Sequence, residues 1–368
     1  MENIVSQIRA LATEADPVGL ANIQSALRQA LFDLERPQDT LMQLYNEHLR
    51  IAVVRIGISS GLFRSLSQSL GPLSVHQLAK QTKISPQLCE RITRFLASNK
   101  MIDEAGQSHF KANKNTNLLA NPAAEAFASH AFDLAGPAIQ ALPGFIIETG
   151  YADVTDSAKT PFQKAFNTDL SCFAWMIQNP EQLGVLQQVM KSWQSSDWMI
   201  GFELFEKEAI NAEGNSERVF FVDVGGGSGH QCAAVRDKYI GLKGQLELSE
   251  VSGVRVEAND FLQEQKFYYL RHVLHDWPDA QCIQILQNLR SAMTQDSRVL
   301  INEVTLPETN VPWQSAMADL SMMVLLGARE RTREQWAMLA QQSGLRITDV
   351  HEYNDSMALS WVIVLEID

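Results

Sequence analysis

A strand-like run that leads directly into a glycine-rich loop constrains the fold of this chain more than any other feature. The run VFFVDV covers residues 219–224, and the loop GGGSG covers residues 225–229, with four glycines in five positions. Glycine tolerates positive φ, and its missing Cβ lets a ligand touch the backbone. A helix that begins just after the loop, near Gln231, would direct free N–H groups at polar or anionic groups of a ligand. The sequence therefore predicts a strand–loop–helix unit that binds a ligand.

Strand-like and helical runs alternate from about residue 218 to the C-terminus. Strand-like runs such as KFYYLRHV and RVLINEV alternate with helical runs such as HQCAAVRDKY and AQCIQILQNLRSAM, and ITDVHEY and LSWVIVLEI close the chain as two strands. Alternation of this kind is typical of a parallel α/β sheet. We therefore expect residues 211–368 to form one α/β domain.

The N-terminal region has the pattern of a winged helix. Residues 1–115 are mostly helical, with a turn between two short helices near residues 83–85 and a hairpin-like piece that ends at Lys111. A winged helix can bind DNA or serve as a dimerisation domain. The net charge of −13 and the lack of a basic recognition helix favour dimerisation and argue against nucleic acid as a partner.

Residues 116–210 are predicted to form a second helical segment, interrupted by proline and glycine. Most of its aromatic side chains are expected to lie in the core. Phe166, Phe173 and Trp175 are candidates for the lining of an aromatic substrate pocket.

The cysteines and the hydropathy exclude several classes of protein. The four cysteines are widely spaced and form no C-x-x-C motif, which indicates reduced thiols in a cytoplasmic protein, with neither a metal site nor a disulfide framework. No apolar run reaches the roughly 18 residues that span a bilayer, so no membrane partner is expected.

A histidine and three carboxylates follow the predicted strands. His275 and Asp276 come just after the run FYYLRHVL, Glu303 lies in the run RVLINEV, and Glu330 precedes a helix. The carboxyl ends of parallel strands meet at one edge of a sheet, where ligands bind. A histidine oriented by carboxylates is a general base near neutral pH. These four residues are therefore the candidate catalytic group.

The motifs GGGSG, HDWPD, NEVTLPE and GARERT together resemble small-molecule O-methyltransferases of the plant caffeate and flavonoid type and their fungal relatives, over essentially the whole chain. The resemblance implies an α/β fold: a class I S-adenosyl-L-methionine (SAM)-dependent methyltransferase domain, Rossmann-like, with a seven-stranded, mainly parallel sheet. It further implies that an all-α winged-helix dimerisation domain precedes this domain, and that the protein is a homodimer acting on a small molecule.

The resemblance also assigns roles to residues. His275 would deprotonate the acceptor hydroxyl, Glu303 and Glu330 would orient it, and Asp276 would help to hold the acceptor oxygen. The cofactor-binding candidates are Asp223, Gly225, Gly226, Gly227, Gly229, Asp260, Phe261 and Arg271. Asp319, Met322 and Met323 match the region that lines the acceptor pocket.

One stretch departs from the family pattern. The family carries a strand after the glycine loop whose terminal acid binds the ribose of SAM, followed by a helix. The segment from Lys238 to Phe261 is too short for both, and Glu247 is the nearest acid in rough register. A loss here would weaken the binding of SAM.

Residues 51–176 also resemble a fungal subgroup of this family, the LepI-like SAM-dependent pericyclases. These enzymes dehydrate a 2-pyridone alcohol to a quinone methide and steer a hetero-Diels–Alder or Alder-ene cyclisation without moving the methyl group. His130 matches a functional histidine of the subgroup, whereas LepI has arginine where this chain has His275. The sequence leaves three alternatives: such a pericyclase, which it favours, an O-methyltransferase with His275 as base, and a non-catalytic binding or regulatory protein.

Overall fold

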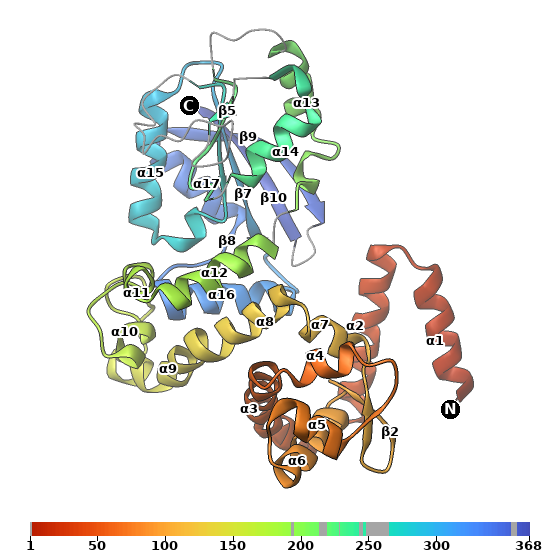
Figure 1. The fold of residues 1–368 in the computed structure, drawn as a ribbon. Coiled ribbons are helices and arrows are strands. Elements are labelled where there is room, and N and C mark those ends of the chain that lie inside the picture. Colours follow the sequence, from red (N-terminus) through yellow and green to blue (C-terminus); the bar gives the residue numbers. More distant parts are fainter. Residues whose placement is uncertain are drawn as a thin grey trace. The chain divides into compact units, whose positions relative to one another are not determined.

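The chain forms two compact units, Met1–Ala120 and Asn121–Asp368 (Figure 1). The structure is a computed structural model that describes residues 2–192, 195–212, 219–227, 229–242, 246–247, 265–354 and 359–368. The finer division predicted from the sequence, with boundaries at residues 115 and 210, stays a prediction.

The first unit is helical apart from a small antiparallel sheet of order β1-β3-β2. Its elements are α1 (Glu2–Glu14), α2 (Pro17–Leu34), α3 (Pro37–Ser59), α4 (Leu62–Ser67), β1 (Leu73–Ser74), α5 (Val75–Thr82), α6 (Pro86–Ser98), β2 (Asp103–Gly106), β3 (His109–Lys111) and α7 (Lys114–Leu119).

Local sequence signals set the turn in this unit. Ser74 and Gln77 form a capping box at the start of α5, in which each side chain accepts a hydrogen bond from the other residue's backbone N–H. Lys83 ends α5 in the left-handed region at φ +59°, and Pro86 begins α6. The predicted turn near residues 83–85 and the hairpin that ends at Lys111 are confirmed.

The second unit opens with helices and continues with the large sheet. The elements before the sheet are α8 (Pro122–Ser129), the π-helix η1 (His130–Ala135), α9 (Gly136–Glu148), α10 (Pro161–Phe166), α11 (Cys172–Gln178), α12 (Pro180–Ser192), η2 (Asp197–Met199) and α13 (Glu203–Ala212). The prediction that residues 116–210 are helical is confirmed where the structure describes them.

The large sheet has seven strands in the order β5-β4-β6-β7-β10-β9, with β8 paired to β7. Strands β5, β4, β6, β7 and β8 are parallel, and β10 is antiparallel to both β7 and β9. The remaining elements are β4 (Phe221–Asp223), α14 (His230–Lys238), η3 (Ile240–Leu242), β5 (Leu246–Glu247), β6 (Phe267–Arg271), η4 (Leu274–Asp276), α15 (Asp279–Ala292), β7 (Arg298–Leu306), α16 (Trp313–Leu326), β8 (Arg331–Thr332), α17 (Arg333–Gln342), β9 (Leu345–Asn354) and β10 (Leu359–Ile367). The predicted α/β class and the seven-stranded, mainly parallel sheet are confirmed.

Two apolar clusters cover the two faces of this sheet. Strand β6 contributes Tyr269 to one cluster and Tyr268 and Leu270 to the other, because successive side chains of a strand point to opposite faces. Helices α13 and α14 cover the first face, and α15 and α17 cover the second (Figure 1). The carboxyl ends of the central strands are thereby held on a rigid core.

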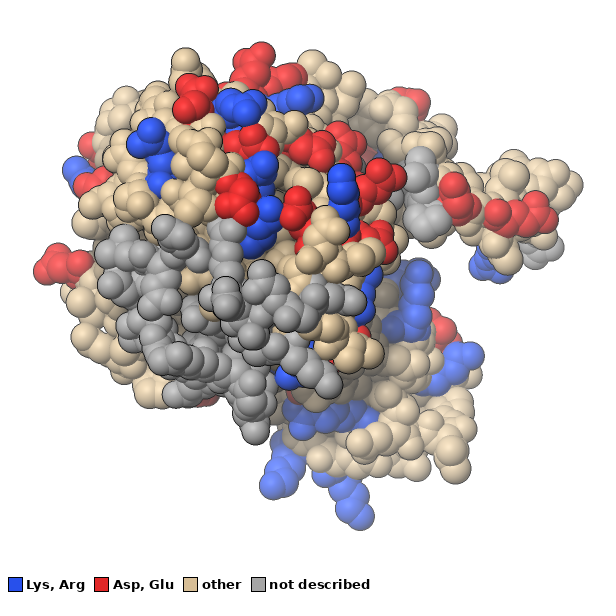
Figure 2. Space-filling view, turned by 90° about the horizontal axis from the view of Figure 1, so that it is seen from above, with Lys and Arg blue, Asp and Glu red and all other residues tan. Residues whose placement is uncertain are grey.

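The net charge of −13 is not gathered into one field on the face that Figure 2 shows. Asp and Glu side chains lie among Lys and Arg side chains over much of the described surface in this view. Pairs such as Arg346 and Glu366, 2.9 Å apart, contribute to this mixture. Among the described helices, none is both long and apolar enough to cross a membrane.

Helices α1 to α3 of the first unit expose many large apolar side chains. These include Ile4, Val5, Leu11, Leu27, Leu31, Phe32, Leu34, Leu41, Met42, Leu44, Tyr45 and Leu49. A surface of this kind suits a protein partner. The homodimer expected from the sequence stays a prediction.

Candidate active site

The glycine loop leaves β4 at Asp223 and enters α14. Gly225, Gly227 and Gly229 have φ values of +78°, +55° and +78°, a region that other residues rarely adopt. Gly226 is constrained differently, because a Cβ there would lie 2.1 Å from Asp223 Oδ2. The predicted strand–loop–helix unit is confirmed, with the Asp223 carboxylate packed beneath the loop.

The Asp223 side chain is an unsatisfied buried group. Its Oδ2 accepts no hydrogen bond from any described residue. Burial raises the pKa of Asp223 to about 7, although the positive charge of Arg271 acts in the opposite direction. A buried carboxylate oxygen without a donor, beside a loop that lacks side chains, fits a ligand group that is cationic or donates hydrogen bonds.

A segment before the sheet forms a further wall of this site. Arg271, at the end of β6, donates from Nη1 to the carbonyl oxygen of Ser195 at 2.9 Å. Gln231 donates to the same oxygen at 3.3 Å and accepts a 2.7 Å hydrogen bond from Trp198 Nε1. Sequence analysis did not assign Ser195, Trp198 or Gln231 to the site. The only available signal was a polar residue in the first turn of the helix after the loop.

A strand after the glycine loop is present, whereas the stretch that would hold the helix after it lies outside the described residues, so the prediction that the segment is too short for both stays a prediction. β5 pairs in parallel with β4, and Glu247 is in register with Val222. The predicted cofactor residues Asp260 and Phe261 lie outside the described residues.

Glu303, in β7, fixes the turn that follows β6. Its side chain is fully buried, and Oε1 accepts hydrogen bonds from the backbone N–H groups of Val273, Leu274 and His275, at 2.9, 2.9 and 3.4 Å. Burial by itself raises the pKa of Glu303, but His275, His272 and the backbone N–H of Val273 lower it by more, and the net shift is downward. Glu303 is therefore a carboxylate that holds the backbone of the turn.

The predicted catalytic residues lie together at this turn. His275 Nδ1 lies 2.9 Å from Glu330 Oε1 and 3.7 Å from Glu303 Oε2, and its Nε2 lies 3.5 Å from Asp276 Oδ1. Asp319, whose predicted place in the lining of the acceptor pocket stays a prediction, accepts the backbone N–H of Glu330 at 3.0 Å. It therefore helps to hold the carboxylate that orients His275.

Burial and like charges set the proton affinities of this group. Burial lowers the pKa of His275, but the carboxylates of Glu303, Glu330 and Asp276 more than offset it, and the net shift is well upward. Burial raises the pKa of Asp276 to about 7, with His275 lowering it and the two glutamates raising it. The imidazole is therefore a strong proton acceptor.

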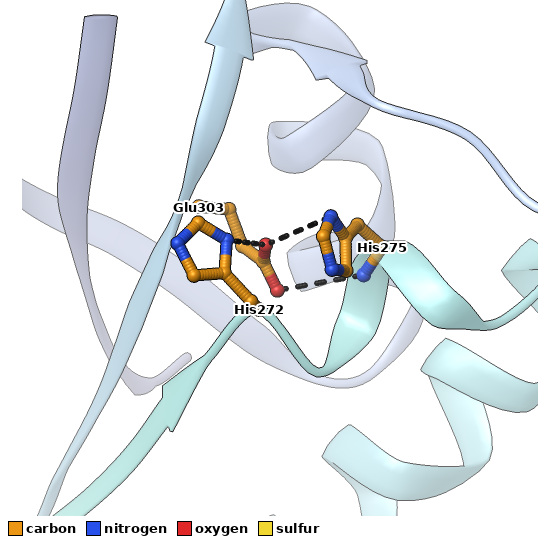
Figure 3. Close-up of side chains that lie close together, drawn as sticks. All are labelled: His272, His275 and Glu303. Carbon is orange, nitrogen blue, oxygen red and sulfur yellow. Dashed lines mark hydrogen bonds and ion pairs between the residues drawn. The ribbon is translucent and has the colours of Figure 1, made fainter. Parts of the chain in front are cut away.

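A second histidine faces the same carboxylate. His272 Nδ1 lies 3.6 Å from Glu303 Oε2, and the rings of His272 and His275 are 5.3 Å apart between centroids. Figure 3 shows a nitrogen of each imidazole directed at the carboxylate of Glu303. Sequence analysis did not assign His272 to the site, because its nearness to Glu303 depends on the pairing of β6 with β7.

Arg331 is a fully buried cation that sequence analysis also did not assign. Its guanidinium donates to the carbonyl oxygens of Leu274 and Trp277 at 3.0 and 2.9 Å, and it pairs with Asp279 at 2.7 Å. These bonds hold the carbonyl groups on either side of the catalytic residues. Its position directly after Glu330 is the only signal that the sequence offered.

Two of the three aromatic candidates pack against one apolar cluster that includes the end of α16. Phe166 and Trp175 have ring centroids 4.7 Å apart, and both pack against this cluster, as do Met322 and Met323. Phe173 is outside it and 38% exposed. Burial raises the pKa of Cys172, at the start of α11, to about 12, and the charge of Asp276 adds to the shift. The cluster therefore adjoins the catalytic turn.

His130 begins the π-helix η1. Its Nδ1 is buried and has no hydrogen-bond partner within the described part of the chain, and burial lowers its pKa. Helix α16 contacts both η1 and the η4 turn that carries His275. His130 is thus a neutral imidazole with an unused polar atom.

The fold and this site define an enzyme built on the class I methyltransferase sheet. Residues 150–346 match the O-methyltransferase domain family. The chain belongs to the O-methyltransferase family, whose cofactor is SAM. Membership of an enzyme family removes the basis for the non-catalytic alternative.

Two relatives and one solved structure illustrate the likeness. The demethylsterigmatocystin 6-O-methyltransferase of Aspergillus flavus is 36% identical over 96% of this chain and 95% of its own length. The O-methyltransferase lepI of Aspergillus flavus is 35% identical, over 95% of each chain. The structure of the LepI complex with SAM has a TM-score of 0.90 and 33% identity, and covers 100% of this chain and 98% of LepI.

Replacing Gly226 tests the cradle beneath the glycine loop. In Gly226→Ala the new Cβ would displace the Asp223 carboxylate, so we expect the Kd for SAM to rise at least about tenfold by titration calorimetry. Gly184→Ala is the matched control, since a Cβ at Gly184 meets no atom within 4 Å. Unchanged affinity in Gly226→Ala would contradict this account of the loop.

The raised pKa of Asp223 predicts a pH-dependent penalty on stability. Between its ordinary value of 3.8 and its folded value of about 7, the native state binds more protons than the unfolded state, so stability falls as the pH rises through this window. Asp223→Asn removes the penalty. We expect its free energy of unfolding without cofactor, relative to wild type, to increase by on the order of 2 kcal/mol between pH 5 and pH 8. Urea titrations at both pH values measure this, and a pH-independent difference would refute the assignment.

Proposed function

We propose that this protein is a SAM-dependent O-methyltransferase that methylates a phenolic or enolic hydroxyl group of a secondary metabolite. The observation that carries the proposal is the 2.9 Å contact between His275 Nδ1 and Glu330 Oε1. In the deprotonated ring, this contact places the single proton on Nδ1 and leaves the lone pair of Nε2 to accept the proton of the acceptor hydroxyl.

The chain's own residues supply the base and its support. The acceptor hydroxyl gives its proton to His275 Nε2, and Glu303 and Glu330 stabilise the imidazolium that forms. Asp276, whose Oδ1 lies 3.5 Å from Nε2, is placed to hold the acceptor oxygen. Because Glu303 and Arg331 fix the turn from two sides, the ring meets the acceptor in one orientation.

The glycine loop and Asp223 fit the amino-acid part of SAM. The unpaired Asp223 Oδ2 supplies an acceptor for the amino group, and the loop lets the backbone approach the ligand. Bound SAM supplies an electrophilic methyl group on a sulfonium. A relative named demethylsterigmatocystin 6-O-methyltransferase, 36% identical, supports an acceptor that is methylated on oxygen.

Product mass and S-adenosylhomocysteine, measured together, test this proposal. With SAM and a panel of phenolic acceptors, we expect a methylated product and an equal amount of S-adenosylhomocysteine. His275→Ala should reduce the rate about 10²- to 10⁴-fold with unchanged SAM affinity, because only the base is lost. The exposed His76 gives the matched control, His76→Ala. Wild-type methylation by His275→Ala would refute the role of this residue.

A LepI-like pericyclase is the second candidate, and His130 supports it. Its buried, unpartnered Nδ1 is free to bind a polar group of a substrate. A solved structure described as "A Pericyclic Reaction enzyme" is 33% identical, with a TM-score of 0.88. In this reading the chain would dehydrate a 2-pyridone alcohol and steer the cyclisation, with SAM retained as a positive charge.

A pyridone alcohol separates the two candidates. A pericyclase would convert it with loss of water and without S-adenosylhomocysteine, and His130→Ala would slow the conversion or relax its stereochemistry. An O-methyltransferase would leave it unconverted or methylate it. Conversion at the wild-type rate and selectivity by His130→Ala would exclude a role for His130.

A further inference from the structure

One imidazole at the catalytic turn has no place in the proposed methyl transfer. His272 has φ +50°, and its Nδ1 forms no hydrogen bond with any residue that the structure describes. The nearest charged atom printed for it is Glu303 Oε2, at 3.6 Å, which is too long for a hydrogen bond. The same oxygen lies 3.7 Å from His275 Nδ1 and is itself buried without a donor.

Three potential metal ligands therefore converge on one point (Figure 3). One ligand atom each from His272, His275 and Glu303 lies within 4.8 Å of the other two, so the two imidazole nitrogens must also move closer together to share one ion. Zinc–ligand bonds of about 2.0–2.2 Å place two ligands of a tetrahedral ion about 3.4 Å apart. The separations of 3.6 and 3.7 Å reach that value with small side-chain shifts.

The chemistry of the three donors selects the metal. Two imidazoles and one carboxylate, with a fourth position left for water, suit Zn²⁺ and neighbouring divalent transition ions. They do not suit Mg²⁺ or Ca²⁺, which prefer oxygen ligands. The sequence analysis, which considered cysteine spacing, predicted no metal site. The three ligands here come from the ends of two strands that only the sheet brings together.

We propose that His272, His275 and Glu303 form a binding site for a divalent transition-metal ion, Zn²⁺ foremost, and that occupation of this site inhibits the enzyme. A metal on His275 Nδ1 takes the place of the proton donated to Glu330, and the ring proton moves to Nε2. The ring then has no lone pair for the acceptor hydroxyl. The proposed binding of the metal is independent of the proposed function, whereas the proposed inhibition rests on it.

Cobalt absorption tests the site without any activity. We expect untagged wild-type protein to bind one equivalent of Co²⁺ with the visible bands of a four-coordinate ion, and Zn²⁺ to bleach them. His272→Asn should lose the bands, since asparagine tolerates the positive φ but ligates such metals poorly. His76→Asn, in an exposed part of α5, is the matched control and should keep them. Equal spectra for wild type and His272→Asn, or no bands in either, would overturn the site.

Methyl transfer at increasing Zn²⁺ tests the inhibition. We expect Zn²⁺ to inhibit wild type reversibly by chelator, and His272→Asn to keep its metal-free rate while its half-inhibiting Zn²⁺ concentration rises at least about tenfold. Equal inhibition of both proteins would overturn the inhibitory role. If wild type methylates no acceptor, the proposed function fails, and the cobalt spectra still decide whether the metal site exists.

Discussion

The catalytic end of this structure depends on one buried carboxylate. Glu303 lies inside the sheet, where an unpaired charge would be strongly destabilising. It is tolerated because Oε1 collects the backbone N–H groups of Val273, Leu274 and His275, while Oε2 faces two imidazoles. The backbone N–H groups of the turn thereby have an acceptor, and the buried carboxylate has hydrogen-bond donors. These hydrogen bonds fix the position of His275 at the end of the turn.

Two adjacent residues complete the turn from the opposite side. Glu330 reaches the ring of His275, and Arg331 reaches the carbonyl groups of Leu274 and Trp277. The buried guanidinium of Arg331 thus donates hydrogen bonds to backbone carbonyl groups of the turn, whereas Glu303 accepts hydrogen bonds from its backbone N–H groups. A turn with both kinds of backbone group bonded to charged side chains has little freedom to rearrange. This rigidity suits a base whose one free nitrogen must meet a substrate hydroxyl.

The same strand edge joins the cofactor site to the base. Strands β4, β6 and β7 are parallel, so Asp223, Arg271 and Glu303 lie toward one edge of the sheet. Arg271 ties β6 to the segment at Ser195, and His275 follows only four residues later. His275 keeps the orientation that a base requires, which is why we place methyl transfer ahead of the pericyclic alternative. His130, on a π-helix that packs against α16, keeps that alternative testable.

The sequence by itself determined the fold class and the strand–loop–helix unit, and it named the residues of the candidate catalytic group that the structure brings together. These follow from local patterns: glycines where positive φ is required, alternating apolar runs, and charged residues at predicted strand ends. It did not show that Arg331 and Asp319 support the turn, or that His272 shares a carboxylate with His275. Only the tertiary structure decided these, because each depends on the register of strands that lie far apart in the chain.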